Sequence, residues 1–205
     1  MTKSWIISRR SFLGLVGTTT AGILISPDLL AKSGQTPLVR FGVLSDVHYA
    51  NREPAGSRFY GQSLNKVQDC IDQFNREKVD FAIELGDFKD QDAVPNEANT
   101  LKYLSDIEAV FQNFEGPTYH VLGNHDMDGI SKEQFLNRVK NTGISPNQSY
   151  YSFNKKGLHF VILDGNFTKE GKAYDHGNFH WEDASIPRSQ LDWLKKDLKS
   201  TRHPV

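Results

Sequence analysis

Chemically reactive side chains gather in three short motifs, and each motif directly follows an apolar run. The motifs are Asp46-Val47-His48, Gly86-Asp87-Phe88-Lys89-Asp90 and Gly123-Asn124-His125-Asp126. Carboxylate, imidazole and carboxamide groups need partners inside an apolar core, so packing alone does not explain their positions. Together these groups are suited to binding a divalent cation. Any one motif could be an ordinary polar turn, but the same chemistry after three apolar runs favours a metal centre.

The apolar runs before the motifs are short and rich in β-branched or aromatic residues, which is typical of buried strands. They cover residues 38–44, 79–85 and 118–122. Two segments with helical apolar periodicity, 63–74 and 97–114, separate these runs. Strands that alternate with helices form parallel sheets, and ligands bind at the carboxyl ends of such strands. The predicted fold class is therefore α/β, with the three motifs at one edge of the sheet.

Local geometry supports the presentation of the acidic side chains. Asp46 and His48 are two residues apart at an extended chain end, so their side chains point to the same side. Gly86 allows the backbone to turn tightly enough to present Asp87. For Asp90 we expect the role of an ordinary loop carboxylate.

The order, spacing and strand context of the three motifs resemble the first signature blocks of the calcineurin-like metallophosphoesterases. The resemblance extends from about residue 39 to the last residue, Val205. It implies an αββα sandwich with mixed sheets whose C-terminal part is missing, because the later histidine-ending blocks of the family do not occur here. In that family the missing histidines complete the metal ligands.

The resemblance also implies a role for each motif residue. Asp46 and His48 would bind a first metal ion, Asp87 would bridge two ions, and Asn124 would bind the second. His125 would face the leaving group.

The implied cofactors are two divalent or trivalent ions, Mn, Fe or Zn, because mixed nitrogen and oxygen ligands suit all three. Two cations about 3.5–4 Å apart neutralise charge on a phosphate ester and convert bound water into a hydroxide nucleophile. His125 is then the candidate general acid. Asp126 would accept a hydrogen bond from the His125 imidazole and orient it. A helix cap before Ser131 is the alternative role for Asp126.

The second half of the chain predicts supporting structure. Residues 149–153 and 158–163 predict a β-hairpin, whose antiparallel strands imply a mixed sheet. A helix is predicted from residue 186, with Pro187 in its first turn. His120 and His159 alternate with apolar neighbours and are predicted to be structural.

The polar and aromatic loop 174–183 resembles an Asn- and Trp-containing loop in the branch of the family with ADP-ribose and CDP-alcohol diphosphatases and phosphodiesterases. For this loop, a role at the site and a structural role both stay open.

The N-terminus has the pattern of an export signal. Arg9 and Arg10 precede an apolar run over residues 12–25, which is typical of a twin-arginine signal. The run is shorter than the roughly 20 residues that a spanning helix needs, so we expect cleavage, with an uncleaved anchor as the alternative. The predicted organisation is a signal peptide at 1–31, a linker at 32–37 and the phosphoesterase part at 38–205. The expected location is periplasmic or extracellular, without a stable membrane span after cleavage.

Composition limits the possible partners. Lys+Arg 24 against Asp+Glu 25 gives a formal net charge of -1, which lacks the basic excess of a typical nucleic-acid-binding domain. Cys70 is the only cysteine, which excludes an internal disulfide framework and a Cys-rich zinc site.

Two functions follow as hypotheses. The first is a metal-dependent phosphoric ester hydrolase that acts on a small-molecule phosphodiester, pyrophosphate or phosphomonoester. The alternative is a non-catalytic α/β remnant that binds one metal ion or a phosphate ligand, or that another chain completes. The sequence selects neither the substrate nor the oligomeric state.

Overall fold

Three strands form a parallel sheet whose carboxyl ends meet at one edge. They are β1 (Phe41–Leu44), β2 (Phe81–Glu84) and β3 (Thr118–His120), in the spatial order β1-β2-β3. Phe41 pairs with Phe81, and Ala82 pairs with Thr118. The α/β class with a parallel sheet is confirmed.

The computed structural model describes residues 38–205. The signal peptide and linker predicted for residues 1–37 lie outside the described residues. No helix within 38–205 has both the length and the apolar character needed to cross a membrane.

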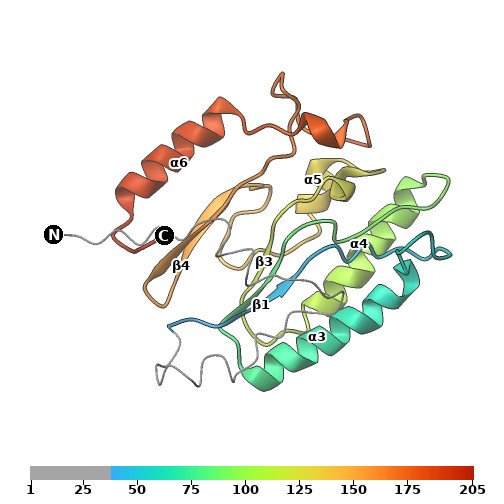
Figure 1. Ribbon diagram of the computed structural model, residues 1–205, viewed down its shortest axis with the longest axis horizontal. Helices are drawn as coiled ribbons and strands as arrows, with labels where there is room; N and C mark the ends of the chain where they lie inside the picture. The colour runs from blue at the N-terminus through green and yellow to red at the C-terminus, as the bar shows by residue number, and fades with distance from the viewer. Residues whose placement is uncertain (1–37) are drawn as a thin grey trace. The chain divides into compact units, whose positions relative to one another are not determined.

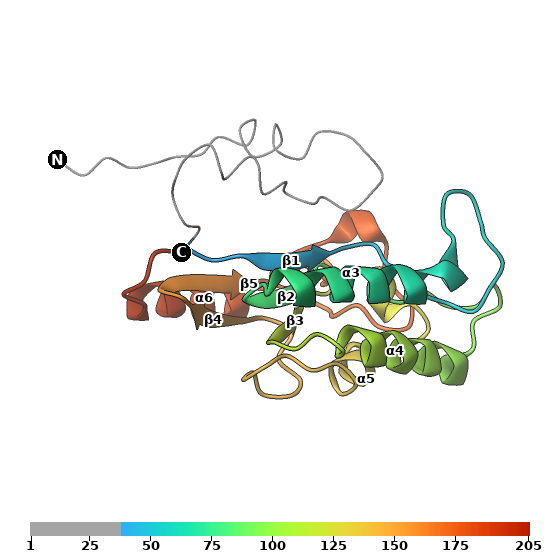
Figure 2. The same cartoon turned by 90° about the horizontal axis from the view of Figure 1, so that it is seen from below.

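Two long helices connect the parallel strands and cover one face of the sheet (Figures 1 and 2). Helix α3 (Ser63–Glu77) buries Val67 and Ile71, and α4 (Glu97–Phe111) buries Leu104, Ile107 and Phe111. These side chains recur every three or four residues, which places them on one face of each helix. Asn96 begins α4 by accepting a hydrogen bond from the Asn99 N–H (3.0 Å). The predicted crossover helices are therefore present, and they enclose the larger apolar cluster.

A separate β-hairpin covers the other face of the parallel sheet. It consists of β4 (Tyr151–Lys155) and β5 (Leu158–Ile162). Lys156 and Gly157 join the strands with φ of 48° and 81°, as a tight primed turn requires. Phe153 stacks on Tyr119 with ring centroids 3.7 Å apart. The hairpin thus packs face to face on the parallel sheet, and its aromatic side chains join the smaller apolar cluster.

The predicted mixed sheet is wrong for the described residues. The parallel strands and the antiparallel strands belong to two different sheets. The reason is that Phe153 stacks on Tyr119, and that Phe153 and Phe160 meet Phe81 in edge-to-face contacts. The hairpin therefore contributes an apolar surface instead of another strand.

Helix α6 (Arg188–Ser200) packs on the outer face of the hairpin. Asp197 accepts a hydrogen bond from Ser152 Oγ (2.7 Å), and it lies 2.7 Å from His159 Nε2. The described part of the chain is therefore layered as α6, hairpin, parallel sheet, and α3 with α4 (Figure 1). Pro187 precedes the first residue of α6 and occupies its N-cap position.

Short elements surround the carboxyl edge of the parallel sheet. They are the 3-10 turns η1 (Tyr60–Gln62), η2 (His125–Met127) and η3 (Trp181–Asp183), and helix α5 (Lys132–Leu136). Ser131 begins α5 with a capping box that includes Gln134. Ser131 itself therefore caps this helix, so Asp126 does not have the capping role considered from the sequence.

Candidate metal centre

Three motif residues have a backbone conformation that side-chain-bearing residues rarely adopt. Asp46, His48 and Asp87 have φ of 56°, 48° and 58°, in the left-handed region. Such conformations cost free energy and are held by surrounding structure, often at functional sites. Here the Asp46 N–H donates to Gly86 O (3.1 Å), and the His48 N–H donates to Asp87 O (2.8 Å). The first two motifs are therefore joined by backbone hydrogen bonds beyond the ends of β1 and β2.

Gly86 and Gly123 bring the second and third motifs into direct backbone contact. A Cβ at Gly86 would collide with the backbone N and Cα of Gly123. A Cβ at Gly123 would collide with the backbone N and the carboxylate of Asp87. Only glycine fits at both positions, because any side chain would separate the loops.

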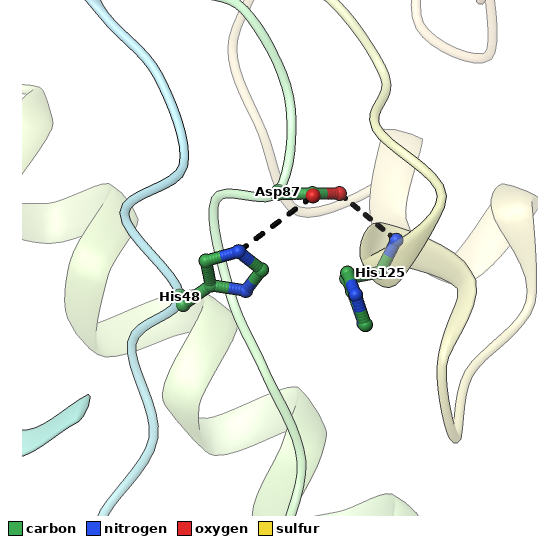
Figure 3. A group of neighbouring side chains, drawn as sticks. All are labelled: His48, Asp87 and His125. Carbon is green, nitrogen blue, oxygen red and sulfur yellow. Dashed lines mark hydrogen bonds and ion pairs between the residues drawn. The ribbon is translucent and has the colours of Figure 1, made fainter. Parts of the chain in front are cut away.

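The three loops bring His48, Asp87 and His125 together (Figure 3). One potential ligand atom from each of these side chains lies within 4.8 Å of the others. His48 Nε2 is 3.7 Å from Asp87 Oδ2, and the backbone N–H of His125 donates to Asp87 Oδ1 (3.0 Å). The His48 and His125 rings are 5.0 Å apart between centroids.

This donor set fits a divalent metal ion. The His48 imidazole and the Asp87 carboxylate are borderline nitrogen and oxygen ligands that suit Mn, Fe and Zn, and the His125 imidazole lies beside them. His48 is buried, and its Nδ1 lies 3.2 Å from Asp90 Oδ2 without the alignment of a full hydrogen bond. A carboxylate behind a ligand imidazole fixes the orientation of the ring, as is common in metal sites.

Asp46 lies at the margin of this group. Its side chain is 70% exposed, its Oδ1 is 4.0 Å from His48 Nε2, and it does not belong to the close group of His48, Asp87 and His125. Asn124, the other expected ligand, directly precedes η2, and its backbone carbonyl accepts the Met127 N–H (3.2 Å).

His125 has a carboxylate at one ring nitrogen and a guanidinium at the other. Its Nδ1 lies 2.6 Å from Asp128 Oδ2, and its Nε2 lies 3.2 Å from Arg58 Nη2. The hydrogen bond to Asp128 raises the pKa of the His125 imidazole. We expected Asp126 in this role, but the structure places Asp128 there. In a 3-10 turn, residues three apart lie on the same side, so residue 128 faces residue 125.

Asp126 instead points into the protein and joins the second and third motifs. Its carboxylate is fully buried and accepts hydrogen bonds from the N–H groups of Asp87 (3.1 Å), Phe88 (2.9 Å) and Gly123 (2.8 Å). Burial raises the pKa of Asp126 to about 6. Asp126 therefore organises the backbone on which Asp87 and His125 are carried.

Three further residues lie at the site although the sequence did not predict them there: Arg58, Lys89 and Asp90. Asp90 was predicted to be an ordinary loop carboxylate, but it is buried between His48 and Arg58, whose Nη1 is 3.4 Å away. Burial raises the pKa of Asp90, but contacts with His48 and the Gln91 N–H outweigh this effect and lower it. Asp90, His125 and Asp128 also form a second group of potential ligands within 4.8 Å.

Lys89 is a buried cation that holds the third motif in place. Its Nζ donates to the carbonyls of His125 (2.7 Å) and Asp128 (2.6 Å). Burial lowers the pKa of Lys89 to about 8. The alternation of Phe88, Lys89 and Asp90 resembles a surface loop in sequence, so only the fold reveals this ammonium group.

The geometry agrees with what comparison with known proteins finds. The sequence profile of the calcineurin-like phosphoesterase family matches residues 39–205. The chain belongs to this family.

Curated relatives of this chain include two plant proteins described as manganese-dependent ADP-ribose/CDP-alcohol diphosphatases. The Oryza sativa subsp. japonica protein is 28% identical over 84% of the chain and 53% of its own length. The Arabidopsis thaliana protein is 30% identical over 73% of the chain and 50% of its own length. The chain thus spans about half the length of these relatives.

A solved structure supports the fold. A dimetal phosphatase from Danio rerio superimposes with a TM-score of 0.64 at 22% identity, over 80% of this chain and 66% of the other. At this identity the similarity concerns the fold.

Proposed function

We propose that this protein is a metal-dependent hydrolase of phosphoric ester bonds, and that it cleaves the pyrophosphate bridge of a small nucleotide such as ADP-ribose. The observation that carries the proposal is the meeting of His48, Asp87 and His125 donor atoms within 4.8 Å. The description of the plant relatives as ADP-ribose/CDP-alcohol diphosphatases supports the choice of substrate. The description of those relatives as manganese-dependent supports Mn²⁺ as the ion.

In this proposal the motif residues hold two metal ions. His48 and Asp87 are the central ligands, and Asp46 and Asn124 complete the ligands that this chain supplies. Bound cations would neutralise charge on the phosphoryl oxygens and make water a stronger nucleophile.

The remaining site residues would act on the substrate. His125 donates a proton to the leaving oxygen, and Asp128 keeps the imidazole in place at a distance of 2.6 Å. The Arg58 guanidinium, beside His125 Nε2, offers hydrogen-bond donors suited to a phosphate group.

The test is a ³¹P NMR assay of the chain with ADP-ribose and MnCl₂. The expected products are AMP and ribose 5-phosphate, formed by addition of one water molecule across the pyrophosphate bridge. Asp87→Asn should abolish the reaction, whereas Asp80→Asn, a carboxylate that pairs with Lys156 away from the motifs, should leave it intact. AMP as the starting compound distinguishes diphosphatase from phosphomonoesterase activity.

Two results would contradict this proposal. Metal binding without turnover of ADP-ribose, CDP-choline or a generic aryl phosphodiester would favour the non-catalytic alternative. Turnover that survives Asp87→Asn would place the reaction elsewhere.

We also propose, from Arg9, Arg10 and the apolar run over residues 12–25, that the protein is exported by the twin-arginine route. Residues 1–37 fused to a reporter protein that folds before export should direct it out of the cytoplasm. Changing both arginines to lysine should block this export. Equal export of the two fusions would contradict the proposed signal.

A further inference from the structure

A row of three buried ionisable side chains runs beneath the metal centre and takes no part in the proposed reaction. Glu84 ends β2, His120 ends β3, and Glu108 lies in α4. Their exposed fractions are 0%, 3% and 6%. Glu84 and His120 are directly paired neighbours across the parallel strands.

The three side chains form a continuous chain of contacts. Glu84 Oε2 lies 3.4 Å from His120 Nδ1, and His120 Nε2 lies 3.0 Å from Glu108 Oε2, though not in full hydrogen-bond alignment. Glu108 Oε1 accepts from the Lys140 N–H (2.9 Å) and from Gln112 Nε2 (2.8 Å). His120 therefore lies between two carboxylates, and the outer carboxylate is anchored by two donors.

Aromatic rings surround this row and exclude water from it. The His120 ring lies 5.1 Å from Phe88 and 5.0 Å from Phe111, measured between centroids. In such surroundings a contact between charged groups is stronger than at the surface, and the loss of one partner is costly.

The second carboxylate oxygen of Glu84 connects this row to the metal centre. Glu84 Oε1 accepts a short hydrogen bond from the Gly86 N–H. The Gly86 carbonyl in turn accepts the Asp46 N–H, and Asp87 is the next residue. Gly86 also touches Gly123, as described above. One residue of the second motif, Gly86, thus contacts the first and third motifs, and Glu84 holds its N–H.

Packing alone gives no reason for these residue types. Buried ion pairs can often be replaced by apolar side chains of similar volume without loss of stability. Burial raises the pKa of Glu84 to about 8, which shows how unfavourable an ionised carboxylate is at this position. Burial lowers the pKa of His120, but Glu108 and Glu84 outweigh this effect and raise it to about 10. The hydrogen bond from the Gly86 N–H to Glu84 gives a reason for a carboxyl group at this unfavourable position.

We propose that Glu84, braced by His120 and Glu108, is a positioning residue that sets the Asp87 carboxylate at the metal centre through the Gly86 N–H. This inference rests on the proposed function, since it assigns Asp87 to metal binding. Glu84 acts only through the backbone and does not contact substrate or metal.

The test compares Glu84→Leu with Glu84→Gln in the full chain, by Mn²⁺ titration, by steady-state kinetics and by NMR of the metal-free protein. Glu84→Leu removes the acceptor for Gly86, so Mn²⁺ affinity and kcat should each fall by about tenfold or more. KM should stay within about threefold. In the metal-free protein, the amide signals of Gly86 and Asp87 should shift.

Glu84→Gln keeps an oxygen that can accept the Gly86 N–H, so it should restore Mn²⁺ affinity to within about threefold of wild type. Because an amide replaces the carboxyl group, the Gly86 amide signal should still shift, but by less than in Glu84→Leu. Ile71→Ala is the control for destabilisation alone, because Ile71 is buried in α3 away from the motifs. It should lower Tm without changing Mn²⁺ affinity.

The outcomes separate this inference from the function on which it rests. If wild type binds Mn²⁺ and Glu84→Leu binds it equally well, the positioning role is wrong and the proposed function stands. If wild type does not bind Mn²⁺, the proposed function fails and this inference fails with it. Should Glu84→Leu not fold, an unchanged Gly86 signal in Glu84→Gln would overturn the positioning role.

Discussion

Asp126 and Asp128 are carboxylates two residues apart that act on different parts of the site. Asp126 accepts three well-formed backbone hydrogen bonds, whereas Asp128 contacts the imidazole of His125. Asp126 therefore joins the loops of the second and third motifs, whereas Asp128 orients the His125 side chain. Substitution of Asp126 should therefore mainly lower stability, and substitution of Asp128 should mainly lower turnover.

For Asp128→Ala we predict a fall in kcat of about tenfold to hundredfold, because His125 loses the group that orients it. Asp128 raises the pKa of His125, so its removal lowers that pKa and depletes the acid form sooner as pH rises. The alkaline limb of the kcat profile should move to lower pH. Steady-state kinetics between pH 6 and 9 measure both effects, and an unchanged alkaline limb would contradict the assignment of His125 as the acid.

For Asp126→Ala we predict a loss of about 3 kcal/mol or more in the free energy of unfolding, because three buried N–H groups lose their acceptor. Urea unfolding followed by circular dichroism measures it. Asp128→Ala is the matched control and should lose about 1 kcal/mol or less. Equal stability losses in the two variants would show that Asp126 has no organising role.

The expected metal ligands could be predicted from the sequence, but the residues that contact the site's imidazoles could not. His48 and Asp87 follow strands directly, so a parallel sheet must bring them together. The contact of Asp128 with His125 depends on a 3-10 turn, which apolar periodicity does not predict. Arg58 belongs to an irregular loop. Such contacts are set by tertiary structure alone.

At the scale of elements, two glycines determine how closely the strand-end loops approach. Gly123 packs against the backbone and carboxylate of Asp87, and Gly86 packs against Gly123. The parallel strands direct the three loops to the same edge of the sheet, and the glycine contacts set the distance between the second and third loops.

For Gly123→Ala we therefore predict the loss of Mn²⁺ binding, since the added Cβ must displace Asp87. Calorimetric titration with MnCl₂ measures it. Gly165→Ala is the control, because a Cβ there meets no atom within 4 Å. Wild-type affinity in Gly123→Ala would mean that the loop spacing does not determine metal binding.

The elements themselves were largely predictable, and their ends and partners were less so. Strand β1 covers 41–44 within the predicted 38–44, and α3 covers 63–77 against the predicted 63–74. The hairpin was expected near its observed place, but its sheet membership was not. Alternating apolar side chains show that a strand has a buried face, and they do not show whether the burial comes from pairing or from stacking.

At the scale of the whole described part, β2 and β3 are buried on both faces, whereas Phe41 and Val43 of β1 are exposed, and the candidate site lies at the carboxyl edge of the sheet. Helices α3 and α4 cover one face and the hairpin covers the other. The motifs at that edge are held by backbone contacts and by buried ionisable side chains such as Lys89 and Glu84. The fold is thus a rigid support for the three motifs.

The central claim is that the strand-end motifs bind metal, and calorimetric titration of the chain with MnCl₂, repeated on Asp87→Asn, tests it most directly. Saturable binding to wild type, with a gain of about 2.7 kcal/mol in the free energy of unfolding at a free Mn²⁺ concentration of about 100 times Kd, is the predicted result. Asp87→Asn should show neither. No binding to wild type, or equal binding to Asp87→Asn, would contradict the claim.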